Sequence, residues 1–139
     1  MERISEDGKM YILRLDSGED LIGSVQEYCR EKKIKNAWFN AIGSTWDLQL
    51  AYYDLDKKTY QIMDFEEFLE IISVTGNISI KDGAIFAHAH GMFGRHDMST
   101  LGGHINRCII SATGEVMLRA LGGEIKRGFD EESGLYILG

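Results

Sequence analysis

The stretch AIFAHAHGM at residues 84–92, followed by LGGH at residues 101–104, determines how this chain is interpreted. Side chains alternate between the two faces of a β-strand, so a strand over residues 84–92 would place His88 and His90 on the same face. His104 follows two glycines and can come from a neighbouring strand. The spacing therefore predicts a surface on which three imidazoles gather.

Three neutral imidazoles form a known ligand set for zinc and similar metals, with a fourth position open to water or substrate. The competing interpretation is that His88 and His90 are hydrogen-bonded core residues. The diglycine before His104 favours the metal, as does the placing of three of the four histidines of the chain in this stretch. Imidazole suits zinc, iron and nickel alike, so the sequence leaves the identity of the metal open.

Length and composition indicate a single domain over residues 1–139, because 139 residues with 44% hydrophobic content fit one core. No apolar run is long enough to cross a bilayer, and the charged N-terminus is unlike a secretory signal. Cys29 and Cys108 lie in apolar segments and are expected to be reduced, buried thiols. These features lead us to expect a cytoplasmic location and no membrane partner.

The net charge of −7 argues against broad contact with a nucleic-acid backbone, which draws on clustered Lys and Arg. The densest basic group, at residues 30–35, falls at the expected end of a helix, where the macrodipole favours cations. The sequence names no small-molecule ligand.

Strand-like alternation dominates the chain, which predicts an α+β fold with one or two helices packed on a largely antiparallel sheet. A helix is expected from a cap at Ser17 to about Lys33, with apolar residues at helical spacing. Asp82 and Gly83 predict a hairpin turn. Strands are expected at residues 9–15, 37–42, 46–52, 59–64, 68–80 (kinked at Gly76), 84–92 and 115–121. The other segments are a loop over 98–103, an apolar segment over 108–112, and a charged surface segment from Gly122 that ends in an apolar piece at 135–138.

Several short pieces occur in a specific order and spacing: NAIGS at 40–44, LEIISVTGNIS at 69–79, KDG at 81–83, HAH at 88–90, GGH at 102–104 and FDEESGL at 129–135. Together, over about residues 9–138, they resemble the plants and prokaryotes conserved (PPC) domain in its stand-alone prokaryotic type. The related domain of plants lies beside AT-hooks in nuclear-localised proteins.

The resemblance implies an α+β fold assembled as a homotrimer. It also implies, for prokaryotic members, a metal site at the positions of His88, His90 and His104. The plant relatives are linked to DNA through AT-hooks, which need an Arg-Gly-Arg-Pro core. Because this chain has no proline, DNA is a partner only by analogy with the family.

Two functions follow from these observations. The first is a metal-binding trimeric domain, with zinc as the expected metal and a regulatory or DNA-associated role by family analogy. The alternative is a hydrolase or lyase that uses metal-bound water on an unknown small molecule. For such an enzyme no catalytic residue is assigned, and the candidates are the loop residues Arg95, His96, Asp97 and Ser99. For the metal-binding domain, Glu70 is a candidate acid behind the histidines. An ordinary surface turn is the competing interpretation of that loop, and whether the protein is an enzyme stays open.

Overall fold

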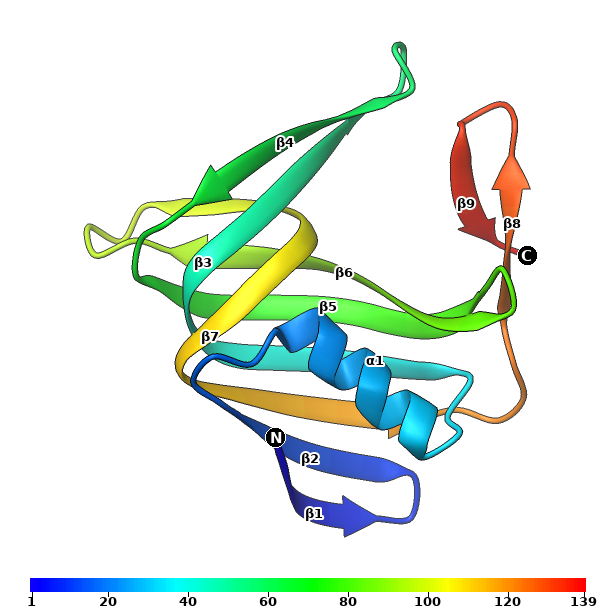
Figure 1. The fold of residues 1–139 in the computed structure, drawn as a ribbon, viewed down its shortest axis with the longest axis horizontal. Helices are drawn as coiled ribbons and strands as arrows, with labels where there is room; N and C mark the ends of the chain where they lie inside the picture. Colours follow the sequence, from blue (N-terminus) through cyan, green and yellow to red (C-terminus); the bar gives the residue numbers. More distant parts are fainter.

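Two long antiparallel strands, β3 (Ala37–Asp54) and β7 (Thr100–Ala120), form the centre of the sheet (Figure 1). The computed structural model describes the backbone of residues 1–139 and the side chains of residues 1–3 and 8–139. This backbone forms one nine-stranded sheet and one helix, α1 (Leu21–Glu31). The other strands are β1 (Glu2–Asp7), β2 (Met10–Asp16), β4 (Thr59–Phe65), β5 (Leu69–Lys81), β6 (Ala84–Gly94), β8 (Lys126–Asp130) and β9 (Leu135–Leu138).

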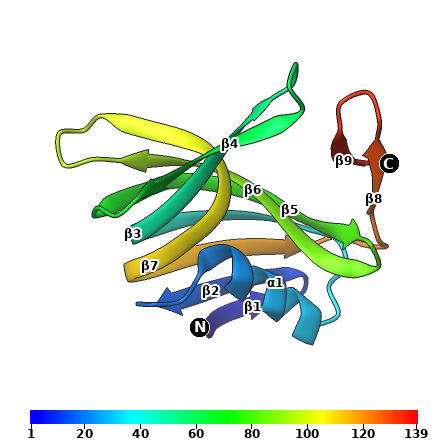
Figure 2. The same ribbon diagram turned by 45° about the horizontal axis from the view of Figure 1, so that its top comes forward.

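The sheet closes on itself in its middle. Its main path is β1-β2-β7-β3-β5-β8-β9, while β4 pairs with β3, and β6 pairs with both β5 and β7. Strands β3, β5, β6 and β7 therefore form a ring of pairings, and Figure 2 shows β7 curving from β6 toward β2. All pairings are antiparallel except that of β5 with β8. The predicted mostly antiparallel α+β architecture is confirmed.

Strand β3 bends at Gly43 instead of ending there, as the sequence had led us to expect. Its pairing registers with β5 and β7 both shift beside this residue. Gly43 has a φ of +148°, and a Cβ atom there would overlap the carbonyl oxygen of Thr113 on β7. Only glycine permits this close crossing, so the two expected strands on either side of Gly43 form one continuous strand.

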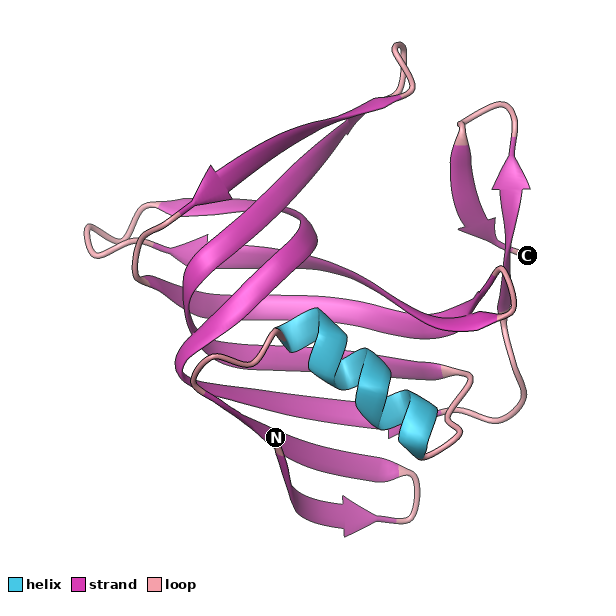
Figure 3. Cartoon of the chain, in the orientation of Figure 1, coloured by secondary structure: helices cyan, strands magenta, loops and turns pink.

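The helix covers one face of the sheet (Figure 3), with its buried side formed by Leu21, Val25, Tyr28 and Cys29 as its apolar spacing predicted. The cap is Asp20, not Ser17, and the helix ends at Glu31 rather than near Lys33. One carboxylate oxygen of Asp20 accepts the Gly23 N–H at 2.8 Å, and the other accepts the Cys108 N–H of β7 at 2.8 Å. Asp20 is the cap in place of Ser17 because its single side chain both caps the helix and joins the helix to the sheet.

Three further expectations for the strands are corrected by the structure. The predicted loop over 98–103 is wrong, because β7 begins at Thr100. This one strand includes the apolar segment at 108–112 and nearly all of the strand expected at 115–121. The irregularity of β5 lies between Ile71 and Ser73 rather than at Gly76. The charged segment after Gly122 forms the β8–β9 hairpin, held to β5 by a short parallel pairing.

Among the described residues, no helix is long and apolar enough to cross a membrane.

Gly76 lies beneath the buried ring of Phe39, so its lack of a side chain matters to packing. A Cβ atom there would overlap this ring and lie 2.7 Å from the carbonyl oxygen of His88. We expect Gly76→Ala to lower the free energy of unfolding in urea by about 2 kcal/mol, as overpacked cores do. The matched control is Gly128→Ala, where a Cβ atom meets nothing within 4 Å. Equal effects of the two substitutions would contradict this account.

Candidate metal centre

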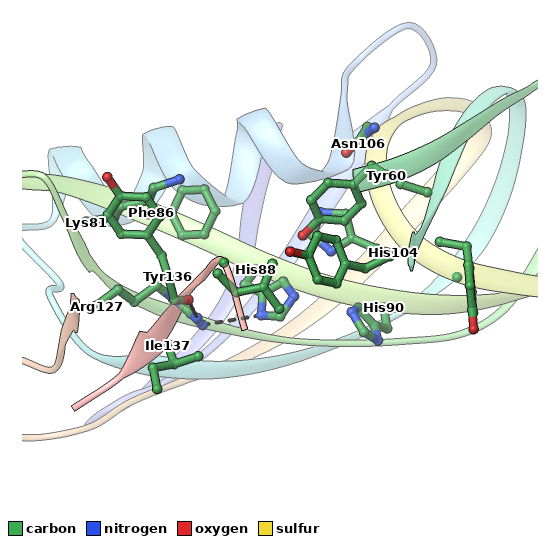
Figure 4. Close-up of a pocket in the computed structure, with 16 residues that line it drawn as sticks. Tyr60, Lys81, Phe86, His88, His90, His104, Asn106, Arg127, Tyr136 and Ile137 are labelled. Atoms are coloured by element: carbon green, nitrogen blue, oxygen red, sulfur yellow. Dashed lines mark hydrogen bonds between the residues drawn. The ribbon is translucent and has the colours of Figure 1, made fainter. Parts of the chain in front are cut away.

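Three histidines of two paired strands lie together, as the sequence predicted. In the register of β6 with β7, His90 stands opposite His104. His88, two residues before His90, lies on the same face of β6. Ring centroids are 5.0 Å apart for His88 and His90, 5.0 Å for His88 and His104, and 5.4 Å for His90 and His104. One nitrogen of each ring lies within 4.8 Å of those of the other two. Figure 4 shows the three side chains converging on one side of the sheet.

This donor set fits a transition metal. Zinc–nitrogen bonds of about 2.0 Å allow ligand nitrogens to lie at most about 4 Å apart. The three nitrogens here lie within 4.8 Å of one another, so small rotations of the imidazole rings would suffice to bring all three to bonding distance of one metal. Three imidazoles leave at least one coordination position for another ligand.

Small residues around the histidines allow the strands to approach one another. A Cβ atom on Gly102 would lie 2.8 Å from the Gly91 carbonyl oxygen of β6, and one on Gly103 would lie 3.1 Å from the Ala51 carbonyl oxygen of β3. The diglycine therefore serves close strand packing rather than a loop. On the opposite face of β6, Ala87 and Ala89 are buried in the core.

The surroundings keep the imidazoles of His88 and His104 neutral. Burial lowers the pKa of His88 to about 4, with further contributions from His104, Arg127 and His90. Burial also lowers the pKa of His104, helped by His90 and Arg127. Neutral imidazole is the form that binds metals, so His88 and His104 are ready to act as ligands at neutral pH.

The histidines open into a cavity of about 660 Å³. This volume lies within the usual range for small-molecule pockets. Aromatic rings supply much of its wall, and the ring of Tyr60 on β4 is 5.6 Å from that of His104. The β8–β9 hairpin forms another side of the cavity. The aromatic lining residues are Tyr52, Tyr53, Tyr60, Phe86 and Tyr136.

Arg127 of β8 is a site residue that the sequence analysis missed. Its guanidinium donates to the Ser79 hydroxyl at 2.9 Å, the Asn77 amide oxygen at 2.9 Å and the Tyr136 carbonyl oxygen at 3.0 Å. It also lies 3.3 Å from Nδ1 of His88. A five-residue strand of mixed character gives no periodic signal, so nothing in the local sequence marks Arg127 as part of a site.

The polar loop after β6 lies outside the cavity lining. Arg95 forms a bidentate ion pair with Glu67, and Asp97 accepts bonds from the backbone N–H and hydroxyl of Ser99. His96 is exposed to solvent. These contacts are those of a surface turn, which was the competing interpretation.

Glu70 is also separated from the histidines. It stands opposite Gly94 at the start of β5, whereas Thr75 and Asn77 of the same strand stand opposite His90 and His88. Glu70 lines a different hollow, with Ile42 and Ser44. The suggestion that it lies behind the metal ligands is therefore wrong.

Comparison with known proteins gives a family and several similar structures. The sequence model of the Plants and Prokaryotes Conserved (PCC) domain matches residues 2–122, so the β8–β9 hairpin lies beyond the matched range. None of the curated proteins compared with the chain matches it in sequence.

Several solved structures resemble the fold over nearly its full length, among them the following three. A metal-containing protein from Archaeoglobus fulgidus is 37% identical with a TM-score of 0.88, and the match covers 99% of this chain and 98% of that one. A protein from Bacteroides thetaiotaomicron, described as a candidate DNA-binding protein, is 30% identical with a TM-score of 0.93 over 97% and 94% of the two chains. A plant- and prokaryote-conserved protein from Pyrococcus horikoshii is 30% identical with a TM-score of 0.85 over 94% and 92%.

The lowered pKa of His88 predicts a pH dependence of stability in the metal-free protein. Between the ordinary pKa of 6.5 and the folded-state value of about 4, the unfolded chain binds a proton that the folded chain does not. Stability therefore rises with pH across this window. We expect the thermal midpoint, measured with a chelator present, to be lower at pH 5 than at pH 7. The variant His88→Gln should lose part of this difference, and an undiminished difference would contradict the assignment.

Proposed function

The chain belongs to the Plants and Prokaryotes Conserved domain family, and on this premise we propose that it is a homotrimeric metal-binding domain whose His88, His90 and His104 hold zinc. The observation that carries the proposal is the convergence of three imidazole nitrogens within 4.8 Å of one another. The description of the 37% identical Archaeoglobus protein as metal-containing supports it.

Zinc is the preferred occupant because three neutral imidazoles with an open fourth position are a common zinc ligand set. Iron and nickel are the alternatives, since imidazole also suits them. A bound metal supplies a Lewis acid and lowers the pKa of a coordinated water. The protein would contribute two imidazole ligands on β6 and a third on β7, and the cavity beside them is lined by aromatic rings.

The cavity also favours a second candidate function, a metal-dependent hydrolase or lyase acting on a small molecule. A volume of about 660 Å³ beside the histidines offers room for a substrate. Arg127 and Lys81 in the cavity lining, rather than the loop at 95–99, are the charged groups that would orient such a substrate. No general acid or base is assigned, so the metal-binding function stands first.

A DNA-associated regulatory role is a weaker part of the proposal. It rests on the description of the Bacteroides protein and on the family. The net charge of −7 and the lack of proline, and so of an AT-hook, leave this chain without the feature that contacts DNA in plant relatives. Such a role would act through a partner protein or a surface of the trimer.

The cytoplasm is the location that we propose. Cys29 and Cys108 are buried free thiols, and burial raises the pKa of each to about 12. Thiols of this kind suit a reducing compartment.

An apolar surface on the sheet supports the proposed trimer. On the face away from α1, Met117 of β7 is paired with Ile12 of β2. On the same face, Trp38 of β3 is paired with the β7 residue two positions beyond Met117. These side chains are exposed in the single chain, Trp38 by 48% and Met117 by 52%. Closed symmetric assembly of identical chains is a common way to cover such a surface.

Metal analysis tests the site. We expect about one zinc per chain in protein purified without a chelator or a metal-affinity tag, measured by elemental analysis. The double variant His88→Ala/His90→Ala should lose the metal, because two of its three ligands are gone. The matched control is His96→Ala, which removes an exposed histidine outside the site. Absence of any transition metal from the native chain, with reconstitution also failing, would refute the proposal.

Sedimentation equilibrium tests the assembly. We expect a mass three times the 15.7 kDa of one chain. The variant Met117→Lys should shift the population toward monomer, because it places a charge in the apolar surface. The control Met98→Lys changes a side chain that is 85% exposed in a turn and should leave the mass unaltered. A native protein that sediments as a monomer would rule out the trimer.

A further inference from the structure

We propose that Arg127 and Lys81 form a subsite for the carboxylate of a small organic acid beside the histidine cluster, and that metal binding opens this subsite. The inference rests on the proposed metal-binding function and names the class of ligand that the site takes. It arises from two cations in the cavity wall, neither of which has an acidic partner among the described side chains.

The charge of the cavity is opposite to that of the chain. The protein has 22 acidic and 15 basic residues, yet the described residues that line the cavity include Lys81 and Arg127 and no Asp or Glu. Elsewhere, Arg95 is paired with Glu67, and Arg107 is paired with Asp47 and Asp64. A concave surface that keeps uncompensated cations in an acidic protein attracts anions.

Arg127 is held rigidly in position to receive such an anion. A guanidinium has five N–H groups. Three of them are directed to Ser79, Asn77 and Tyr136. A fourth is directed to His88 (Figure 4). Ser79 is fully buried. Arg127 is partly buried, and burial lowers its pKa. An ion pair formed there is stronger than one on the open surface.

The contact between Arg127 and His88 links this subsite to the metal. A neutral imidazole has one N–H and one nitrogen with a free lone pair. To accept a bond from Arg127, His88 must keep that lone pair on Nδ1. A metal that binds Nδ1 uses this lone pair, and a metal that binds Nε2 requires the ring proton to move from Nε2 to Nδ1. In both cases the Arg127 N–H loses its acceptor and becomes free for an anion.

The remaining donors and the walls suggest a carboxylate with an apolar body. One N–H of Arg127 is uncommitted, and the one released from His88 gives a second, which suits the two oxygens of a carboxylate. The ammonium of Lys81 lies 4.3 Å from the ring centroid of Tyr136 and 4.9 Å from that of Phe86. These rings offer apolar surface to the body of the ligand, while Lys81 adds charge.

The experiment is a titration of the cobalt-loaded protein with benzoate, followed by calorimetry and by the visible absorption of the cobalt. We expect saturable binding of benzoate and none of the neutral isostere benzamide. In Arg127→Gln the affinity should fall by about tenfold or more, since a charge-assisted pair is lost. The matched control is Lys126→Gln, which removes the same charge from the adjacent residue, outside the cavity lining. It should bind benzoate as the native protein does.

Two comparisons guard against a folding defect in Arg127→Gln. The variant Lys81→Gln leaves the contacts of Arg127 intact and should also weaken benzoate, by a smaller factor. In the native chain freed of metal, benzoate should bind at least about tenfold more weakly, because one N–H of Arg127 is then still bonded to His88.

The outcomes separate this inference from the metal proposal. A chain that loads cobalt but binds neither benzoate nor phosphate overturns the anion subsite alone. Binding of benzamide as tight as that of benzoate overturns it as well. Binding of inorganic phosphate without benzoate overturns the assignment to organic acids. A chain that does not load cobalt refutes the metal site and with it a subsite opened by metal.

Discussion

The pairing of β6 with a strand on each of its edges is the constraint on which the site depends. Because β6 pairs with both β5 and β7, the hydrogen bonds along each of its two edges fix its register. This register puts His90 opposite His104 and turns Ala87 and Ala89 into the core. A slip by one residue would exchange the two faces of the strand, burying the histidines and dispersing the cluster.

The alternation of strands was enough to predict the face shared by His88 and His90, and the Asp82-Gly83 turn was recognised from its residue types. Both residues of this turn have positive φ. His104 was correctly assigned to the histidine cluster, although the two glycines before it were expected to belong to a loop. Its glycines instead allow close packing of β7 against β6 and β3, a relation between strands that local sequence does not contain.

The β8–β9 hairpin could not be predicted, because its place depends on a parallel pairing with β5 across more than forty residues. It brings Arg127 to His88 and Tyr136 to the cavity wall. The site therefore combines a part that follows from strand periodicity with a part that follows only from tertiary structure. The first supplies the three imidazoles of the proposed metal site, and the second supplies positive charge and aromatic surface in a chain of net charge −7.

X-ray absorption spectroscopy at the zinc edge of the loaded protein tests the central claim most directly, because it identifies the atoms that touch the metal. The account predicts a shell of three imidazole nitrogens at about 2.0 Å, with the multiple scattering typical of histidine rings, and at least one further light atom. A shell that contains sulfur, or only oxygen without imidazole scattering, would contradict the assignment of His88, His90 and His104 as the metal ligands.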